Sequence, residues 1–246
     1  MTALTSTIQS QKEYNSTEWT GLYKLGAVTS LLILGTALLE ILITFLPGGY
    51  TTAKTVVDWF SLLHDNWFLG LRNLGLLNIV MTALSIPMFF ALCVAHWKVN
   101  PKYSALAMIT SFIGITVFYA TNRAFAMLDL SNQYAVAHTD AQRAVLEVAG
   151  QALLAVGQSH TPGTFIGFFL SEIAGILISV VMLRGGMFSR LSAWAGIVGF
   201  GMLWVYEICQ SFIPEASSFA LIFAMIGGIL NLVWYGLIAQ RLFKIA

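Results

Sequence analysis

The chain has 246 residues, of which 58% are hydrophobic and only 9% are charged, and its formal net charge is +1. Soluble domains carry roughly 25% charged residues, so this composition excludes a soluble globular protein and indicates one whose surface faces lipid. A net charge near zero argues against nucleic acid as a partner, because such binding needs a concentrated basic face.

The first 20 residues are polar and lack the apolar centre of a secretory signal. We expect residues 1–20 to form a cytoplasmic tail, followed by a single transmembrane domain over residues 21–246. Within that domain, six apolar runs are long enough to cross a bilayer, which takes about 20 helical residues. They cover residues 21–46, 68–95, 104–127, 163–183, 192–213 and 219–241.

All six runs must be helical, because lipid offers no hydrogen-bond partner to the backbone of an open strand. The sequence therefore predicts an all-α, polytopic membrane bundle of six transmembrane helices. Lysine and arginine residues near the ends of the runs predict its orientation. Two of them, Lys54 and Arg143, fall on one side, and eight fall on the other: Lys12, Lys24, Lys98, Lys102, Arg184, Arg190, Arg241 and Lys244. Because positive charge is retained inside, both termini are expected to be cytoplasmic.

Two segments on the outer side have the pattern of amphipathic helices. The first, residues 51–67, is expected to lie in the membrane interface, with Trp59 and Trp67 at the level of the headgroups. The second, residues 139–157, begins with a capping box of Thr139 and Gln142. It is expected to lie on the membrane or to cap the bundle, and its apolar face is formed by Val145, Val148, Ala152 and Val156.

Five ionisable side chains fall inside the apolar runs, namely Glu40, Arg72, Arg123, Glu172 and Glu207. A charge at membrane depth costs at least about 2.5–3.5 kcal/mol, so such residues usually face the bundle interior and pair. The helical rise per residue places all five in the outer half of the membrane. We expect them to line an outward-facing polar pocket, although snorkelling arginines and purely structural ion pairs remain alternatives.

The leading interpretation of this pocket is a binding site for a small molecule or a lipid headgroup. Two alternatives remain open. One is an accessory subunit that packs against other membrane proteins, as a homo-oligomer or in a larger complex. The other is a membrane-embedded enzyme that uses one carboxylate as a general base.

No metal site or bound cofactor is predicted. The sequence has no HExxH motif, no P-loop and no dinucleotide-binding fingerprint after a strand. His64, His138 and His160 all fall in the outer loops without the spacing of helical metal ligands, and they are interpreted as solvated side chains.

The segment MLRGGMFSRLSAWAGIVGFGM resembles a bacterial family of small six-helix membrane proteins, catalogued as domain of unknown function 4386. In that family a short basic turn precedes a helix punctuated by glycines, and the matching positions here are Arg184, Arg190, Leu191, Ser192, Gly196 and Gly199. The resemblance is best over residues 180–241. It implies six spans in a bacterial-type plasma membrane and carries over no catalytic residue.

Overall fold

The computed structural model describes residues 19–46 and 53–246. Nearly all of the predicted 1–20 tail therefore lies outside the described residues, as does the start of the 51–67 segment. Within the described part, six helices are long and apolar enough to cross a membrane, which confirms the all-α, six-helix prediction. They are α2 (Thr20–Phe45), α5 (Leu76–His96), α6 (Pro101–Thr121), α9 (Phe165–Gly185), α10 (Arg190–Phe212) and α11 (Ser217–Ile245).

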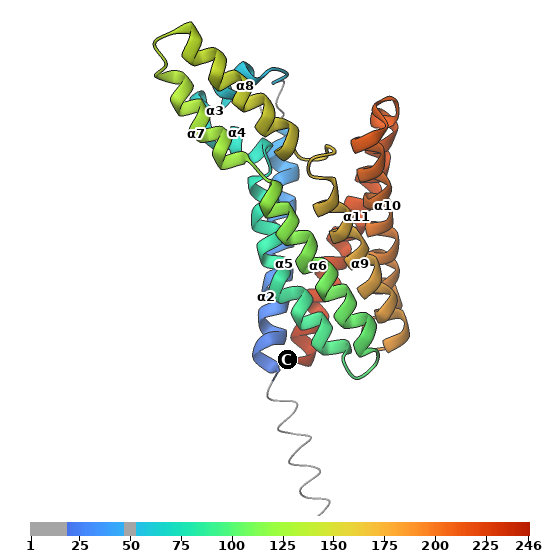
Figure 1. Ribbon diagram of the computed structural model, residues 1–246. Coiled ribbons are helices and arrows are strands. Elements are labelled where there is room, and N and C mark those ends of the chain that lie inside the picture. Colours follow the sequence, from blue (N-terminus) through green and yellow to red (C-terminus); the bar gives the residue numbers. More distant parts are fainter. Residues whose placement is uncertain (1–18, 47–52) are drawn as a thin grey trace, which may run out of the picture.

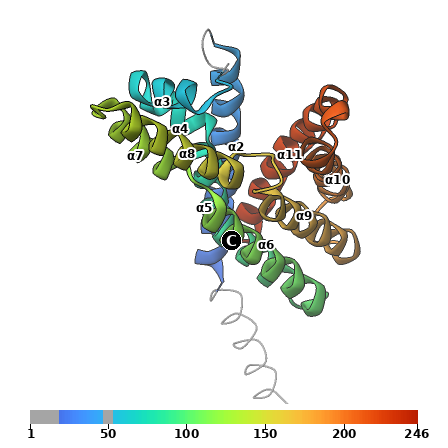
Figure 2. The ribbon, with the colours of Figure 1, turned by 45° about the horizontal axis from the view of Figure 1, so that its top comes forward.

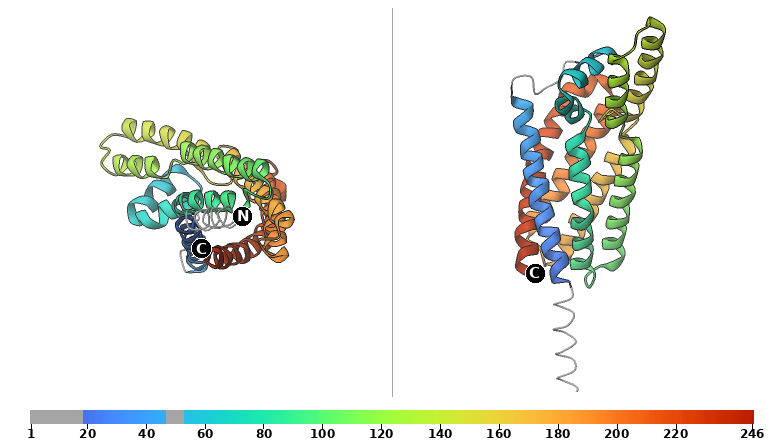
Figure 3. Two further views of the ribbon diagram at one scale, coloured as in Figure 1. Left: turned by 90° about the horizontal axis from the view of Figure 1, so that it is seen from below. Right: turned by 90° about the vertical axis from the view of Figure 1, so that its left-hand side faces the viewer.

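These long helices form a ring, as the view along the bundle shows (Figure 3). Each one packs on the next in the order α2, α5, α6, α9, α10 and α11, and α11 closes the ring against α2. Buried apolar side chains such as Ala27, Met88, Ile178 and Trp234 form the core between them. We call the end at which α2 begins and α11 finishes the terminal end, and the opposite end the far end (Figure 1).

Four shorter helices stand at the far end and form a lobe with its own core. They are α3 (Val56–Asp65), α4 (Trp67–Asn73), α7 (Ala124–Ala135) and α8 (Asp140–Gly157). The side chains of Trp59, Phe60, Leu63 and Met127 are buried there, and Ser131 Oγ donates a hydrogen bond of 2.7 Å to the Phe60 carbonyl. The lobe lies on the side of α5 and α6, away from α10 and α11 (Figure 2). On that other side, a 3-10 turn, η1 (Pro214–Ala216), joins α10 to α11.

The two predicted amphipathic segments both contain helices. The side chain of Trp59, which was expected at the level of the headgroups, is only 3% exposed, because it packs inside the lobe instead of facing outward. Helix α8 does begin at the predicted capping box of Thr139 and Gln142, with both hydrogen bonds present. The predicted apolar face of α8 is turned outward, since Val145 and Val148 are among the exposed large hydrophobic side chains.

The second and third apolar runs, predicted as continuous helices, are each interrupted. The first break separates α4 from α5 at Gly75, whose φ of 96° is left-handed and favours glycine. The second follows α6 at Asn122, whose backbone is extended. Asn122 Nδ2 donates a hydrogen bond of 3.0 Å to the Leu74 carbonyl, and Asn122 Oδ1 accepts one of 3.1 Å from the Ala124 amide. One side chain therefore satisfies backbone groups at both breaks. The runs 68–95 and 104–127 each comprise two helices, although residues 101–135 together still form one candidate membrane span.

The connection from α8 to α9 packs against both breaks. A Cβ added to Gly75 would lie 3.1 Å from Ser159 Oγ, and one added to Gly157 would overlap the backbone and side chain of Arg123. Three segments distant in sequence thus meet where the lobe joins the bundle. The contacts at this junction hold the connection between α8 and α9 in place, including His160.

Candidate functional site

Glu40 and Arg72 form an ion pair between α2 and α4. Arg72 Nη2 lies 2.7 Å from Glu40 Oε1 and donates a further hydrogen bond of 2.9 Å to the Glu40 carbonyl. It also donates to Thr44 Oγ1, and Nη1 donates to Asn73 Oδ1 at 3.1 Å. The Arg72 side chain is only 3% exposed, whereas that of Glu40 is 35% exposed. This guanidinium is already engaged within the protein, so it serves to tie the lobe to the bundle.

Arg123 lies at the break between α6 and α7, as the residue that precedes α7. It is half-buried and packs against Gly157. Among the described residues, no carboxylate lies within ion-pair distance of its guanidinium. Arg123 is thus separate from the Glu40–Arg72 pair.

Glu207 is buried on α10 and is held by two side chains. Its Oε2 lies 2.6 Å from His160 Nδ1, and its Oε1 accepts a hydrogen bond of 3.3 Å from Ser211 Oγ. The Glu207 side chain is 2% exposed, while that of His160 is 34% exposed. Glu207 is therefore linked to the surface through the imidazole.

His160 is held in an unusual backbone conformation. Its φ is 58°, and it is the only residue other than glycine in the described part of the chain with a positive φ. Thr164 stabilises the preceding turn, since its hydroxyl donates to the Gln158 carbonyl at 2.9 Å. The imidazole stacks on Phe168 with ring centroids 4.7 Å apart and meets Tyr206 edge-on at 5.1 Å. Such strained positions concentrate at functional sites, where surrounding contacts maintain them.

Glu172 lies on α9, seven residues from its first residue and so roughly 10 Å along the helix from the far end. Its Oε2 is buried and has no hydrogen-bond partner among the described residues. Glu207 and Tyr235, from α10 and α11, lie within electrostatic range of its carboxyl group. Burying a carboxylate without a partner is costly, so this group needs a proton or a cation for balance.

The five residues selected from the sequence therefore separate into three places. Glu40 pairs with Arg72, Glu172 lies near Glu207, and Arg123 stands apart. We call Glu172, Glu207 and His160 the carboxylate–histidine cluster. His160 was not among the five residues selected from the sequence. No local pattern reveals it, because 47 residues separate it from Glu207 and the fold alone brings them together.

One of the comparisons with known proteins finds a match. A family model described as a domain of unknown function, DUF4386, matches residues 31–237. No curated protein and no solved structure matches the chain. The family match covers most of the chain and extends well beyond residues 180–241, where the resemblance is strongest by sequence. The chain is thus a multi-pass membrane protein by its helices, and it belongs to the family catalogued as domain of unknown function 4386.

Proposed function

We propose that this protein resides in a bacterial-type plasma membrane and that its carboxylate–histidine cluster binds the ammonium group of a small molecule or a lipid headgroup. The observation that carries the proposal is Glu172 Oε2, which is buried without a hydrogen-bond partner in the described structure. A second carboxylate, that of Glu207, lies within electrostatic range.

The charges and rings around the cluster favour a cation over an anion. The ion pair of Glu40 already engages Arg72, so that guanidinium does not neutralise the two carboxylates of the cluster. An ammonium group between Glu172 and Glu207 would supply the missing charge and a hydrogen-bond donor. The aromatic faces of Phe168 and Tyr206, which flank His160, can also stabilise a cation.

The distribution of basic residues supports an outward-facing cluster. Seven described lysine and arginine residues lie at or near the terminal end: Lys24, Lys98, Lys102, Arg184, Arg190, Arg241 and Lys244. The positive-inside rule would place that end in the cytoplasm and the far end outside. A reporter active only in the cytoplasm, fused to the C terminus, tests this orientation. We expect activity, and a fusion active only on the outer side would overturn the outward-facing site.

Ligand-dependent thermal stability of the purified protein tests binding. The probes are ethanolamine and tetramethylammonium, each as the chloride and compared with sodium chloride at equal ionic strength. At ten times its Kd, a bound cation should stabilise the fold by about 1.4 kcal/mol, or roughly 3–6 °C in Tm for a chain of this size.

Glu172→Gln and Glu207→Gln should each abolish the cation-dependent shift, because each removes one of the two negative charges. Glu215→Gln is the matched control, since that carboxylate is exposed at the same end of the molecule. His160→Asn tests the imidazole while retaining a residue that tolerates a left-handed backbone. If neither probe shifts Tm, or if Glu172→Gln keeps the full shift, the binding proposal fails.

A second candidate function, packing against another membrane protein, is favoured by the outer face of α8. Val145 and Val148 are exposed there, whereas Leu146 packs toward the core of the lobe. Photo-crosslinking in native membranes tests this second function. It compares a photo-crosslinking residue at position 148 with one at position 146. A crosslinked protein of defined mass from 148 alone supports an accessory subunit, and crosslinks to lipid alone contradict it.

A further inference from the structure

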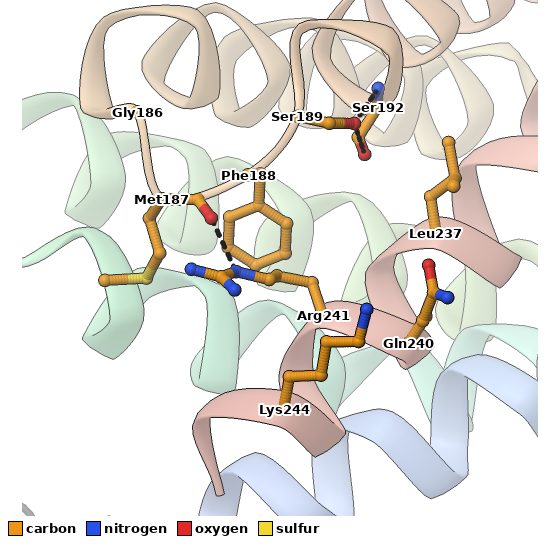
Figure 4. Close-up of a pocket in the computed structure, with 9 residues that line it drawn as sticks. All are labelled: Gly186, Met187, Phe188, Ser189, Ser192, Leu237, Gln240, Arg241 and Lys244. Carbon is orange, nitrogen blue, oxygen red and sulfur yellow. Dashed lines mark hydrogen bonds between the residues drawn. The ribbon is translucent and has the colours of Figure 1, made fainter.

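A second charged feature lies at the terminal end of the bundle, opposite the carboxylate–histidine cluster. A cavity of about 370 Å³ opens between the turn that joins α9 to α10 and the last turns of α11 (Figure 4). Its polar lining comes from Ser189 and Ser192 on one side and from Gln240, Arg241 and Lys244 on the other. No carboxylate is among the lining residues.

The cavity is positively charged. Arg241 and Lys244 extend from α11 toward the turn, as Figure 4 shows. Arg241 Nε donates a hydrogen bond of 2.6 Å to the Met187 carbonyl, which fixes the guanidinium against the wall. Within the described part of the chain, no carboxylate lies within ion-pair distance of either cation. Two adjacent positive charges therefore have no negative counterpart among the described residues.

The opposite wall adds hydroxyl groups and the start of a long helix. Ser189 caps α10, and its Oγ accepts a hydrogen bond of 3.0 Å from the Ser192 amide. The two hydroxyl groups lie 2.8 Å apart. The beginning of a helix carries partial positive charge, which adds to the field of the two cations across the cavity. The two cations and the two hydroxyl groups that line this cavity, together with its volume, suit a tetrahedral anion.

We propose that this cavity binds a phosphate group, carried either by an anionic lipid headgroup or by free phosphate. Arg241 would contact the phosphate through the guanidinium nitrogens that do not bond Met187, and Lys244 would act as a point charge. The neighbouring surface suits a lipid, because Leu191 and Trp194 on the first turns of α10 are exposed. Basic pockets between membrane helices on the cytoplasmic side commonly bind anionic headgroups.

Two arms of one experiment separate the sources of the phosphate group. Thermal stability of the full chain in neutral detergent is measured with sodium phosphate against sodium chloride of equal ionic strength. It is also measured with short-chain phosphatidylglycerol against short-chain phosphatidylcholine. Stabilisation by phosphate assigns the site to a free anion, and stabilisation by phosphatidylglycerol alone assigns it to a lipid headgroup.

Variants then locate the binding. Lys244→Gln should weaken the apparent affinity by about tenfold or more, the loss typical of removing one charge-assisted hydrogen bond, and Arg241→Gln should do the same. Lys244 is exposed, so its variant is expected to fold even if Arg241→Gln does not. Lys102→Gln, at the same end but outside the cavity, is the matched control. Absence of stabilisation in both arms, or an equal loss with Lys102→Gln, overturns the proposal.

Discussion

Breaking the ion pair between Glu40 and Arg72 should have unequal effects, depending on which partner is removed. Glu40→Gln leaves a guanidinium that is 3% exposed without its counter-charge. Arg72→Met leaves Glu40, whose side chain is 35% exposed, so its carboxylate can turn toward water or headgroups. Removal of one partner is costly mainly because the other charge stays buried. We therefore expect Glu40→Gln to be the more destabilising change.

The contacts of Arg72 set the magnitude. Loss of one member of a buried pair costs about 3–5 kcal/mol. After Glu40→Gln, Arg72 keeps neutral acceptors in the carbonyl of residue 40, Thr44 and Asn73, so we expect about 3 kcal/mol, at the low end of that range. For Arg72→Met we expect about 1 kcal/mol, because the remaining charge is partly solvated. The double variant should resemble Arg72→Met alone, since neither leaves a buried guanidinium at position 72 without its counter-charge.

Equilibrium unfolding in mixed micelles, followed by tryptophan fluorescence, measures these differences. The four proteins of the double-mutant cycle are compared under identical conditions, which isolates the coupling between the two side chains. If Glu40→Gln is no more destabilising than Arg72→Met, a buried guanidinium without its counter-charge is not the cause of the loss. Effects of the two single variants that simply add in the double variant would exclude coupling between the two side chains.

Three further changes test the helix packing, the left-handed turn at Gly75 and the cap of α3. A Cβ on Gly196 would lie 2.5 Å or less from side chains of α9 and α11, so Gly196→Ala should lower the free energy of unfolding by about 1–3 kcal/mol. A Cβ on Gly201 would have nothing within 4 Å, so Gly201→Ala should not destabilise the protein. Gly75→Ala forces a left-handed residue and should cost about 1–2 kcal/mol, with a smaller loss for Gly75→Asn; equal effects would contradict the left-handed turn. Hydrogen bonds from the backbone amides of Thr55 and Lys54 hold the pKa of the Asp58 carboxyl group below its usual value. The stability that Asp58 gives α3 should therefore be complete above its unfolded pKa of about 3.9 and be lost as pH falls through the lower folded value. Circular dichroism across that range, with Asp58→Asn as the reference, should show an acid-dependent loss in the wild type alone.

The two proposed sites have opposite charge and lie at opposite ends of the bundle, so each provides a control for the other. Glu172→Gln should leave the response to phosphate unchanged, and Lys244→Gln should leave the response to ammonium probes unchanged. A variant that abolishes both responses has lost its fold, which distinguishes general instability from loss of a site.

Local patterns in the sequence predict much of the architecture. The six spans are evident because runs of about 20 apolar residues are the only stable way to cross lipid. The start of α8 is equally local, since Thr139 and Gln142 cap the helix through groups three residues apart. The helix breaks were missed because hydropathy does not register backbone conformation. Gly75 interrupts its run with a left-handed backbone, and Asn122 satisfies the Leu74 carbonyl at that break across 48 residues of sequence.

The pattern of hydropathy along the chain predicts six membrane helices and identifies five charged residues within the apolar runs. Composition and hydropathy are enough for that, because lipid imposes the same requirement on every span. The partners of those charges depend on the three-dimensional fold. The fold pairs Arg72 with Glu40, leaves Arg123 apart, and brings His160 to Glu207 near Glu172. These contacts depend on the ring order of the helices and on the junction with the lobe, which join residues far apart along the chain.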